Sequence, residues 1–552
     1  MRFTRRRSFA LLLSLFALLV VTTAVPASAD TRPVTVTTDK GTLAGGTADG
    51  VDRFLGIPYA APPVGHRRWQ PPAPAAAWAG VRSATAYGPR CLQAANGQSA
   101  GPGMSEDCLY LNVYTPAKRG NRPLPVMFWI HGGGFSSGSG DIYDGSRIAK
   151  ADNVVVVSIN YRLGVFGFLD LPGLSSQGAG DYGLLDQEAA LRWTHRDIGA
   201  FGGDPDRVTI AGQSAGGHSV CALLASPPAR GLFSGAIIQS GGCPSLTVAQ
   251  ATARGRSYAA AAGCGDVPAS VSCLRNKPAD QLLASDGGFL GGLLSGPLPV
   301  AGVPELPLAP GTAVRSGRYA HVPLLIGTTR DEVREWALPF AGATQAQYER
   351  AVRLEFGARA DAVLAHYPYR ARSGPYAATY AISSLWDDSS VFYGLAGCQY
   401  QNLTAEFAAR QPRTYLYEFD DPHPPTPGAP ADFDAGAPHT GELSYLWPSE
   451  TSSLLSPPQQ ELSSEMVRYW GSFVEHANPA TPGQAPWPAY GSGSGGDGGD
   501  GYMSLLPGGG SRALDAGVYA ARHQCAFWNS IRYGWLTTDP GRLAAEAGVP
   551  TS

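Results

Sequence analysis

Hydrophobic and polar positions along the chain form two alternating kinds of segment. Short continuous apolar runs lie at 126–130, 154–159, 235–239 and 322–327, and such runs are typical of strands buried on both faces of a sheet. Stretches between them, such as 186–198, read as helices. Strands that alternate with helices predict an α/β fold, with a central, mostly parallel sheet covered by helices on both faces.

Other segments refine this outline. Positions 34–38 and 105–114 alternate between apolar and polar residues like strands, and 414–419 predicts a further strand late in the chain. The segment 54–65 is dense in proline, so we expect it to be ordered but irregular, neither a helix nor a central strand. The Gly, Ser and Asp residues of 491–501 predict a surface loop. The sequence has no internal repeat and no linker that divides it.

The N-terminal segment reads as a targeting signal. It combines basic residues near the start, an apolar stretch at 11–21 and a small-residue cleavage pattern at 27–29. We therefore expect a secreted, extracellular protein, exported by the secretory or the twin-arginine route and cleaved near Ala29. The apolar stretch is short for a membrane span, so no stable membrane anchor is expected. After this signal peptide (1–29), we expect residues 30–552 to form one domain.

Composition narrows the possible partners. Of 552 residues, 44% are hydrophobic and the formal net charge is -3, without a basic stripe, so nucleic acid is not expected as a partner. Export allows the 8 cysteines to form disulfides, and none has the Cys-x-x-Cys spacing of a zinc site. We expect neither a metal nor another cofactor. Spacing leaves the connectivity open, although Cys91 with Cys108 and Cys264 with Cys273 would each close a short loop.

The most specific chemical signal lies at 207–220. A short β-branched strand runs into Gly212-Gln213-Ser214-Ala215-Gly216 and then into a helix of small residues. A serine at such a sharp strand-to-helix turn has an exposed hydroxyl, and the helix N-terminus behind it favours developing negative charge. The two glycines leave room where a Cβ would collide with neighbouring backbone. We therefore predict that Ser214 is a nucleophile.

Two other Gly-x-Ser-x-Gly sequences, around Ser99 and Ser136, lack this context. The Ser136 copy is not followed by a helix-forming run, and the Ser99 copy is followed at once by Pro102 and Gly103. Neither serine is expected to act as a nucleophile.

The sequence also offers partners for Ser214. Three glycines, 132–134, follow the buried strand at 126–130, and their unshielded N–H groups would suit an oxyanion hole. A nucleophilic serine needs a histidine base and an orienting carboxylate, which in α/β-hydrolases follow it in the order acid, then histidine. The acid candidates at a strand end are Asp331 and Glu332. The histidines beyond them are His366, His423, His439, His476 and His523.

An ordered set of motifs carries a family resemblance. The motifs are Phe-Leu-Gly-Ile-Pro-Tyr-Ala at 54–60, Ser-Glu-Asp-Cys-Leu-Tyr-Leu-Asn at 105–112, His-Gly-Gly-Gly-Phe at 131–135, Asp186-Gln187, Phe-Gly-Gly-Asp-Pro at 201–205 and the turn at Ser214. With this set the chain resembles the type-B carboxylesterases of the carboxylesterase and cholinesterase family, over nearly all of its length after the signal. The resemblance implies an α/β-hydrolase fold and a serine carboxylesterase.

The resemblance also implies roles for individual residues. It gives the acid role to Glu332, in a Gly-x-x-x-Asp-Glu pattern, and leaves Asp331 as the second choice. It gives the base role to His439, in a Gly-x-x-His-x-x-Glu-Leu pattern, and makes His423, set between prolines, a poor alternative. The other histidines would be surface or packing residues.

Further positions complete the implied site. The oxyanion hole would consist of the N–H groups of Gly133, Gly134 and Ala215, and Ser240 would support the acid. Gln213 stands where many relatives carry Glu, which removes a negative charge beside the nucleophile.

The resemblance pairs three sets of cysteines. It joins Cys91 with Cys108, Cys264 with Cys273, and Cys398 with Cys525. Cys221 and Cys243 are left as either a fourth bridge or two free buried thiols.

The implied function is the hydrolysis of neutral carboxylic esters through an acyl-enzyme on Ser214, with a small-molecule ester as the partner. The loop between Cys91 and Cys108 holds no aromatic residue, whereas cholinesterases place a cation-binding Trp there, so a choline ester is disfavoured. A lipase acting on longer-chain lipid esters is the alternative. A non-catalytic adhesion-type ectodomain is disfavoured because the triad residues are all present. The sequence does not specify the acyl group, the alcohol or the oligomeric state.

Overall fold

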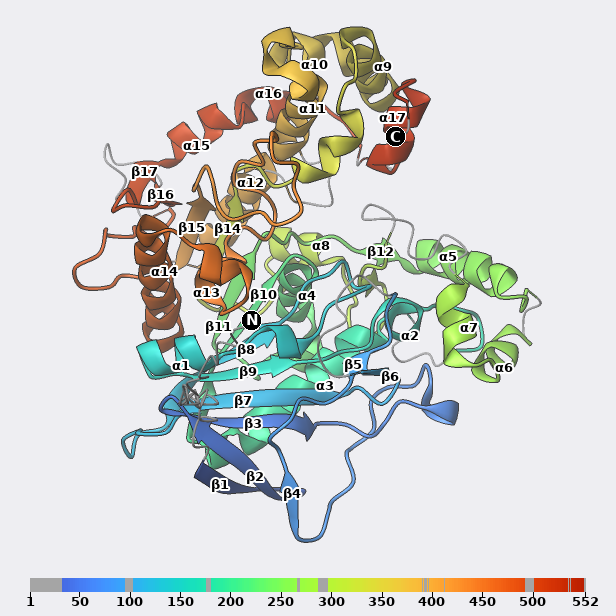
Figure 1. Cartoon of the computed structure of the whole chain (residues 1–552). Coiled ribbons are helices and arrows are strands. Elements are labelled where there is room, and N and C mark those ends of the chain that lie inside the picture. Colours follow the sequence, from blue (N-terminus) through green and yellow to red (C-terminus); the bar gives the residue numbers. More distant parts are fainter. Residues whose placement is uncertain are drawn as a thin grey trace, which may run out of the picture.

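A large central sheet organises the computed structural model (Figure 1), which describes residues 32–550 apart from 95–102, 175–179, 266–268, 286–295, 390, 392–394, 396, 412, 492–500, 535 and 537. The predicted targeting signal, Ser99 and most of the Gly/Ser/Asp segment at 491–501 lie outside the described residues.

Within the described chain the main sheet has 13 strands, in the order β1-β2-β3-β7-β9-β8-β10-β11-β14-β15-β16-β17, with β4 beside β2. The strands are β1 (Arg32–Thr38), β2 (Gly41–Ala48), β3 (Val51–Pro58), β4 (Val81–Ser83), β7 (Tyr110–Pro116), β8 (Leu124–Ile130), β9 (Val155–Ile159), β10 (Gly203–Gln213), β11 (Gly235–Gln239), β14 (Leu324–Thr329), β15 (Thr414–Phe419), β16 (Gly501–Leu505) and β17 (Arg512–Asp515).

The strand directions confirm the predicted α/β architecture. Neighbours from β9 through β16 run parallel, while the pairs among β1, β2, β3 and β7, the pair β7 and β9, and the pair β16 and β17 are antiparallel. The strand β10, which leads to the predicted nucleophile Ser214, lies between β8 and β11 in the middle of the parallel part. Parallel strands direct their carboxyl ends to one edge of the sheet, so the loops that follow β8, β10, β11 and β14 gather there.

Two segments differ from the sequence-based expectation. The sequence predicts an irregular segment at 54–65, but its first part belongs to β3, which lies between β2 and β7. The strand is possible because its proline, Pro58, is its last residue and does not interrupt the hydrogen bonds of the strand interior. The strand predicted from 105 begins only at Tyr110, because Met104–Ser105 (β6) instead pairs with Arg90–Cys91 (β5) beside a disulfide.

Helices cover both faces of the sheet because its strands alternate between two apolar cores. In β8, Val126, Phe128 and Ile130 enter one core, and Met127 and Trp129 enter the other. The first core is covered by α3 (Tyr182–Asp197), α4 (Ala215–Ala225), α5 (Val248–Ala261), α8 (Pro310–Arg315), α12 (Gly397–Ala408) and α15 (Ala516–Arg522). The second is covered by α1 (Ser146–Asp152), α13 (Leu443–Leu446) and α14 (Pro457–His476).

A third apolar core packs a mainly helical region at the end of the molecule opposite β1, β2 and β4 (Figure 1). Its helices are α9 (Gln345–Phe356), α10 (Ala360–His366), α11 (Ala377–Asp388), α16 (Cys525–Ser530) and α17 (Pro540–Glu546). The remaining elements of the described chain are α2 (Gly164–Phe168), α6 (Ser270–Arg275), α7 (Ala279–Ala284), the two-stranded sheet of β12 (Leu246–Thr247) and β13 (Val300–Ala301), and short 3₁₀ turns.

Disulfides join Cys91 to Cys108, Cys264 to Cys273 and Cys398 to Cys525, the three pairs that the family resemblance implies. Cys221 and Cys243 form a fourth bridge, which settles the alternative that the sequence left open. This bridge ties α4, the helix that follows Ser214, to the loop that follows β11.

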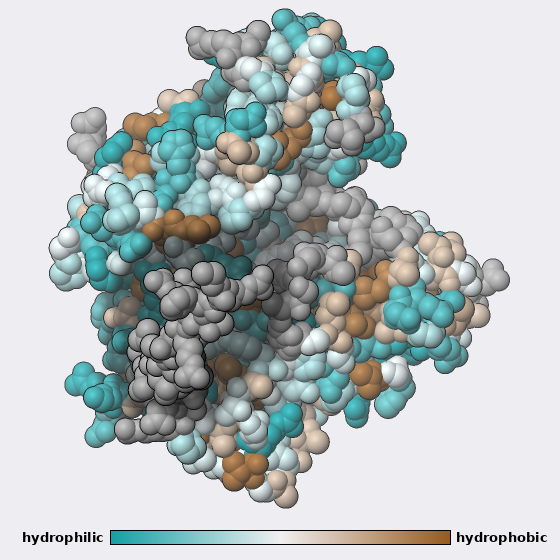
Figure 2. Space-filling view, viewed as in Figure 1, coloured by the Kyte–Doolittle hydropathy of each residue, from teal (hydrophilic) through white to brown (hydrophobic). Residues whose placement is uncertain are grey.

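Among the residues that Figure 2 colours by hydropathy, hydrophobic ones lie in small groups separated by hydrophilic ones. None of the helices in the described ranges is both long enough and apolar enough to cross a membrane.

Candidate active site

Ser214 lies at the sharp turn between β10 and α4. Its backbone has φ 59° and ψ -124°, a conformation that L-residues rarely adopt outside such turns. All other residues of the stretch 208–226 are buried, whereas Ser214 is partly exposed. The hydroxyl is therefore presented at the carboxyl edge of the sheet, as a nucleophile at a strand-to-helix turn requires.

The turn depends on the two glycines that flank it. A Cβ on Gly216 would lie 2.0 Å from the carbonyl oxygen of Ile130, and a Cβ on Gly212 would lie 2.5 Å from the Gly216 carbonyl. Both contacts are with backbone, which cannot move aside as a side chain can. The helix α4 can approach the end of β8 this closely only with glycine at these positions.

Backbone N–H groups surround the space beside Ser214. A Cβ on Gly132 would lie 3.0 Å from the Ser214 Cβ, so the glycine loop after β8 packs directly against Ser214. Gly133 and Gly134 have φ 108° and 59°. In the part of the chain that the structure describes, the N–H groups of Gly133, Gly134 and Ala215 have no acceptor, so all three remain able to bind an oxyanion.

Glu332 and His439 meet next to this turn. Glu332 Oε2 lies 2.5 Å from His439 Nδ1, and the backbone N–H of His439 donates to the Glu332 carbonyl over 3.1 Å. The other carboxylate oxygen accepts hydrogen bonds from the Thr328 hydroxyl, at 2.6 Å, and from the Thr329 N–H, at 2.9 Å. The end of β14 thereby fixes the carboxylate, and the carboxylate fixes the imidazole.

Burial and charge oppose each other at this pair. Burial alone would raise the pKa of Glu332, but the attraction of His439 and the hydrogen bonds to the carboxylate outweigh it, so the pKa of Glu332 is lowered. Burial alone would lower the pKa of His439, but the neighbouring Glu332 charge raises this pKa above its ordinary value. The pair is therefore built to stabilise an imidazolium, which is the form that a general base reaches after it accepts a proton.

Asp331, the second candidate acid, points to other partners. Its carboxylate contacts Arg334 and Arg330 and accepts the Ala437 N–H at 2.8 Å, and its own N–H donates to the Ala437 carbonyl. Asp331 thus joins the loop of the acid to the loop of His439, and it makes no contact with the imidazole.

The other candidate histidines lie away from Ser214. His423 belongs to the loop after β15, His366 is exposed and bonds Gln524, and His476 is exposed near the end of α14. His523 is buried between the carboxylates of Asp388 and Glu418, at 2.8 and 2.6 Å.

The Ser214 hydroxyl has no hydrogen-bond partner among the described residues. Instead, the Gln213 amide lies 3.3 Å from His439 Nε2, the nitrogen that faces away from Glu332. Because Nδ1 donates to Glu332, Nε2 is the free acceptor and Gln213 donates to it. Catalytic hydrogen bonds are often absent or long without substrate. The lack of a hydrogen bond between Ser214 and His439 is therefore compatible with His439 acting as the base for Ser214.

Ser240 lies after β11, and its N–H donates to the Gly327 carbonyl of β14 over 2.8 Å. Its buried hydroxyl lowers the pKa of Glu332, although the oxygen has no hydrogen-bond partner of normal geometry among the described residues. This is the place in which the resemblance puts a serine that supports the acid.

Three further groups belong to the same neighbourhood. Glu442 is buried and bonds the Gln239 amide at 3.2 Å, and burial together with the charge of Glu332 raises its pKa to about 7. The Trp336 ring lies 5.0 Å from the His439 ring. The buried His218, whose pKa burial lowers to about 4, accepts the Gly242 N–H at Nδ1 over 2.8 Å.

The predictions from the sequence include no role for these groups. Glu442 stands within the Gly-x-x-His-x-x-Glu-Leu pattern, and His218 follows the nucleophile by one helical turn, so both positions carried a usable signal. The position of Trp336 carried no such signal, because its contact with His439 depends on the path of the chain after β14. In the described ranges, no group of three or more His, Cys, Asp and Glu residues is arranged to hold a metal ion.

Comparison with known proteins identifies relatives over most of the chain. Residues 32–528 match the model of a family described as the carboxylesterase family. The chain is 36% identical over 474 residues to the para-nitrobenzyl esterase of Bacillus subtilis (strain 168), which covers 82% of this chain and 92% of that protein. It is 35% identical over 500 residues to the fumonisin B1 esterase of Sphingopyxis macrogoltabida, covering 85% of this chain and 87% of that protein. A solved structure of a PNB esterase is similar with a TM-score of 0.74 at 32% identity, over 89% of this chain and 99% of that chain.

We predict that Glu332→Gln lowers kcat on the order of 10³- to 10⁴-fold while the fold is kept, because an amide cannot stabilise the imidazolium or hold the required tautomer. Asp331→Asn should lower kcat far less, since Asp331 does not contact the imidazole. Steady-state kinetics with circular dichroism as the folding control measure both. A larger kcat loss in Asp331→Asn would reverse the assignment.

We predict that Gln213→Glu moves the acid limb of kcat/KM to higher pH by roughly one unit. A carboxylate close to Nε2 would favour the imidazolium and raise the pKa of His439 further, so the neutral base would form only at higher pH. The pH profile of kcat/KM for an uncharged ester measures the shift, with Gln213→Met as the uncharged control. An unmoved limb, or one at lower pH, would show that position 213 does not act on His439.

Proposed function

Because the chain belongs to the carboxylesterase family and is a carboxylic ester hydrolase, we propose that it is a secreted serine esterase that cleaves neutral carboxylic esters through an acyl-enzyme on Ser214. The observation that carries the proposal is the 2.5 Å contact between Glu332 and His439 beside the turn that exposes Ser214. Nucleophile, base and acid come from three separate loops at one edge of the sheet, which supports a common task.

The proposed reaction has two halves, the acylation and the deacylation of Ser214, and the same groups act in both. The Ser214 Oγ bonds to the ester carbonyl carbon as its proton passes to His439 Nε2. The resulting oxyanion accepts hydrogen bonds from the N–H groups of Gly133, Gly134 and Ala215. Collapse of this intermediate breaks the bond to the alcohol, which leaves with the proton from His439, and the acyl group stays on Ser214.

Water completes the proposed cycle. His439 takes a proton from a water molecule as its oxygen attacks the acyl carbon, and the second oxyanion uses the same N–H groups. Its collapse breaks the bond to Ser214, which regains its proton from His439, and the carboxylic acid is released.

Uncharged substrates suit the groups that surround the nucleophile. Gln213 puts a neutral amide near His439, and the segment between Cys91 and Cys108 contains no aromatic residue that could hold a cation. The relatives named above include an esterase of para-nitrobenzyl esters.

Export and a single domain complete the proposal. The basic and apolar N-terminal residues with their cleavage pattern support a signal peptide at 1–29, and the disulfides are compatible with an oxidising compartment. The family match across 32–528 supports one domain over 30–552.

We predict that Ser214→Ala lowers the rate on the order of 10⁴- to 10⁶-fold, because nothing else in the site can form the acyl-enzyme. Ser136→Ala is the matched control: it removes a hydroxyl from the same pentapeptide pattern, but this hydroxyl bonds the Gly134 carbonyl in a turn without a following α-helix. The rates at which both variants hydrolyse p-nitrophenyl acetate test this assignment. A folded Ser136→Ala variant as inactive as Ser214→Ala would contradict the assignment.

We predict that kcat/KM for acetylthiocholine is about tenfold or more below that for an uncharged thioacetate ester of similar size, because the segment between Cys91 and Cys108 has no aromatic residue to hold the cation. Parallel assays that detect the released thiol compare the two substrates directly. Equal or higher efficiency with the choline ester would refute the preference for neutral esters.

A further inference from the structure

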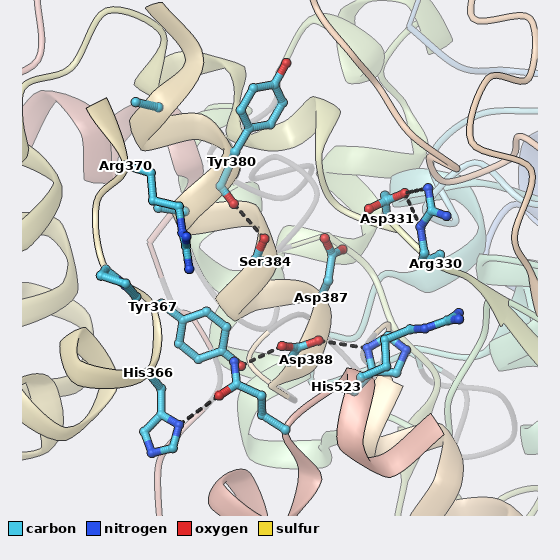
Figure 3. A pocket seen from close by; sticks show the side chains of 15 residues that line it. Arg330, Asp331, His366, Tyr367, Arg370, Tyr380, Ser384, Asp387, Asp388 and His523 are labelled. Atoms are coloured by element: carbon cyan, nitrogen blue, oxygen red, sulfur yellow. Dashed lines mark hydrogen bonds and ion pairs between the residues drawn. The ribbon is translucent and has the colours of Figure 1, made fainter. Parts of the chain in front are cut away.

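A cavity lies beside the loop that carries Glu332, and Arg330 and Asp331 of this loop line it. Its volume is about 380 Å³, which is enough for a small organic molecule. Its walls come from the loop after β14, the segment after α10, helix α11 and the junction of α15 and α16. Figure 3 shows Ser384 and Asp387 of α11 between Arg370 on one side and Arg330 on the other.

Residues of this cavity hold both neighbours of Glu332. On one side, Arg330 bonds Asp331 at 2.9 Å. On the other side, Asp387 accepts the N–H of the buried Val333 at 2.8 Å. Anything that shifts Arg330 or Asp387 therefore acts on the backbone that carries the acid of the triad.

The cavity offers hydrogen-bond donors that the described residues leave unused. Arg370 lines the cavity and makes no hydrogen bond or ion pair with the described residues. Arg522 bonds Glu418 and Asp420 through Nη1, while its Nε and Nη2 atoms have no hydrogen-bond partner in the described part of the chain. Guanidinium groups present paired N–H donors that match the two oxygens of a carboxylate.

Charged side chains of both signs line the cavity: Arg330, Arg370, Arg522 and His523 lie among Asp331, Asp387 and Asp388. The two carboxylates that hold His523 raise the pKa of that imidazole to about 10. Arg330, Arg522 and His523 each have a carboxylate partner, whereas Arg370 makes no ion pair with the described residues. Arg370 is therefore the cation of this cavity that a bound carboxylate could pair with.

The walls also suit an organic group. Tyr367, Tyr380, Ala377 and Ala381 contribute aromatic and apolar surface next to the arginines. An inorganic ion would leave most of the volume unfilled, whereas a carboxylate attached to a small organic body would use both the donors and the apolar wall.

We propose that this cavity binds a small organic carboxylate between Arg370 and Arg522, and that the bound anion acts on the catalytic step through the backbone around Glu332. The ester hydrolysis itself releases carboxylic acids of this chemical class. The second half of the proposal rests on the role proposed for Glu332, whereas binding can be measured without any catalysis.

Binding is tested with benzoate as the probe, by isothermal titration calorimetry on the full chain. Arg370→Ala should weaken benzoate binding at this site about tenfold or more, because it removes a charged donor, and Arg370→Lys should keep part of the affinity. Arg350→Ala, which removes an exposed arginine of α9 outside the cavity, is the matched control and should bind benzoate normally. Inorganic phosphate should bind about tenfold more weakly than benzoate.

The effect on catalysis is measured with p-nitrophenyl acetate. Benzoate should change kcat in the unmodified enzyme and in Arg350→Ala but not in Arg370→Ala, whose kcat without benzoate should be normal. Competition at the catalytic centre would change KM alone and would persist in all three proteins.

Three results would overturn the proposal. Equal benzoate affinity of Arg370→Ala and the unmodified chain would remove the site, and phosphate binding as tight as benzoate would remove its preference for an organic carboxylate. A kcat that benzoate leaves unchanged, with binding intact, would remove the link to Glu332.

Discussion

The close crossing of α4 over the end of β8 is the constraint on which the active site depends. The carbonyl of Ile130 occupies the place that a Cβ of Gly216 would need, so any larger residue would push the helix away from the sheet. The same crossing sets the strained backbone of Ser214 and brings the glycine loop after β8 against it. The positions of Ser214 and of the glycine N–H groups proposed as the oxyanion hole therefore follow from one steric requirement.

A second constraint aligns Glu332 with His439. The loops that carry Glu332 and His439 exchange backbone hydrogen bonds at two places, Asp331 with Ala437 and His439 with Glu332. These bonds hold the two side chains within hydrogen-bonding distance inside a buried site, where the electrostatic interaction is stronger than in water. Asp331 therefore holds the two loops together, whereas its neighbour Glu332, the proposed acid, makes the charged contact with His439.

Local patterns in the sequence were enough to predict the parallel sheet and the Ser214 turn. The continuous apolar runs became β8, β9, β11 and β14, and the strand-glycine-helix pattern gave the turn. The choice of Glu332 over Asp331 needed the family resemblance, because both carboxylates follow the same strand and periodicity cannot say which one reaches a histidine more than 100 positions away. Proline density alone predicts an irregular segment at 54–65, but β3 forms there because Pro58 is the last residue of the strand. The cavity beside the loop of Glu332 joins four distant segments, and no local pattern signals such a meeting.

The central claim is that Ser214 is the nucleophile, and covalent labelling tests it most directly. The enzyme is incubated with diethyl p-nitrophenyl phosphate, which transfers its diethylphosphoryl group to an activated serine. The masses of the intact protein and of its proteolytic peptides are then measured by mass spectrometry. The account predicts one diethylphosphoryl group per chain, on the peptide that contains Ser214, with activity lost in proportion to labelling. A label on the peptide of Ser136 or Ser99, or full inactivation with Ser214 unlabelled, would contradict it.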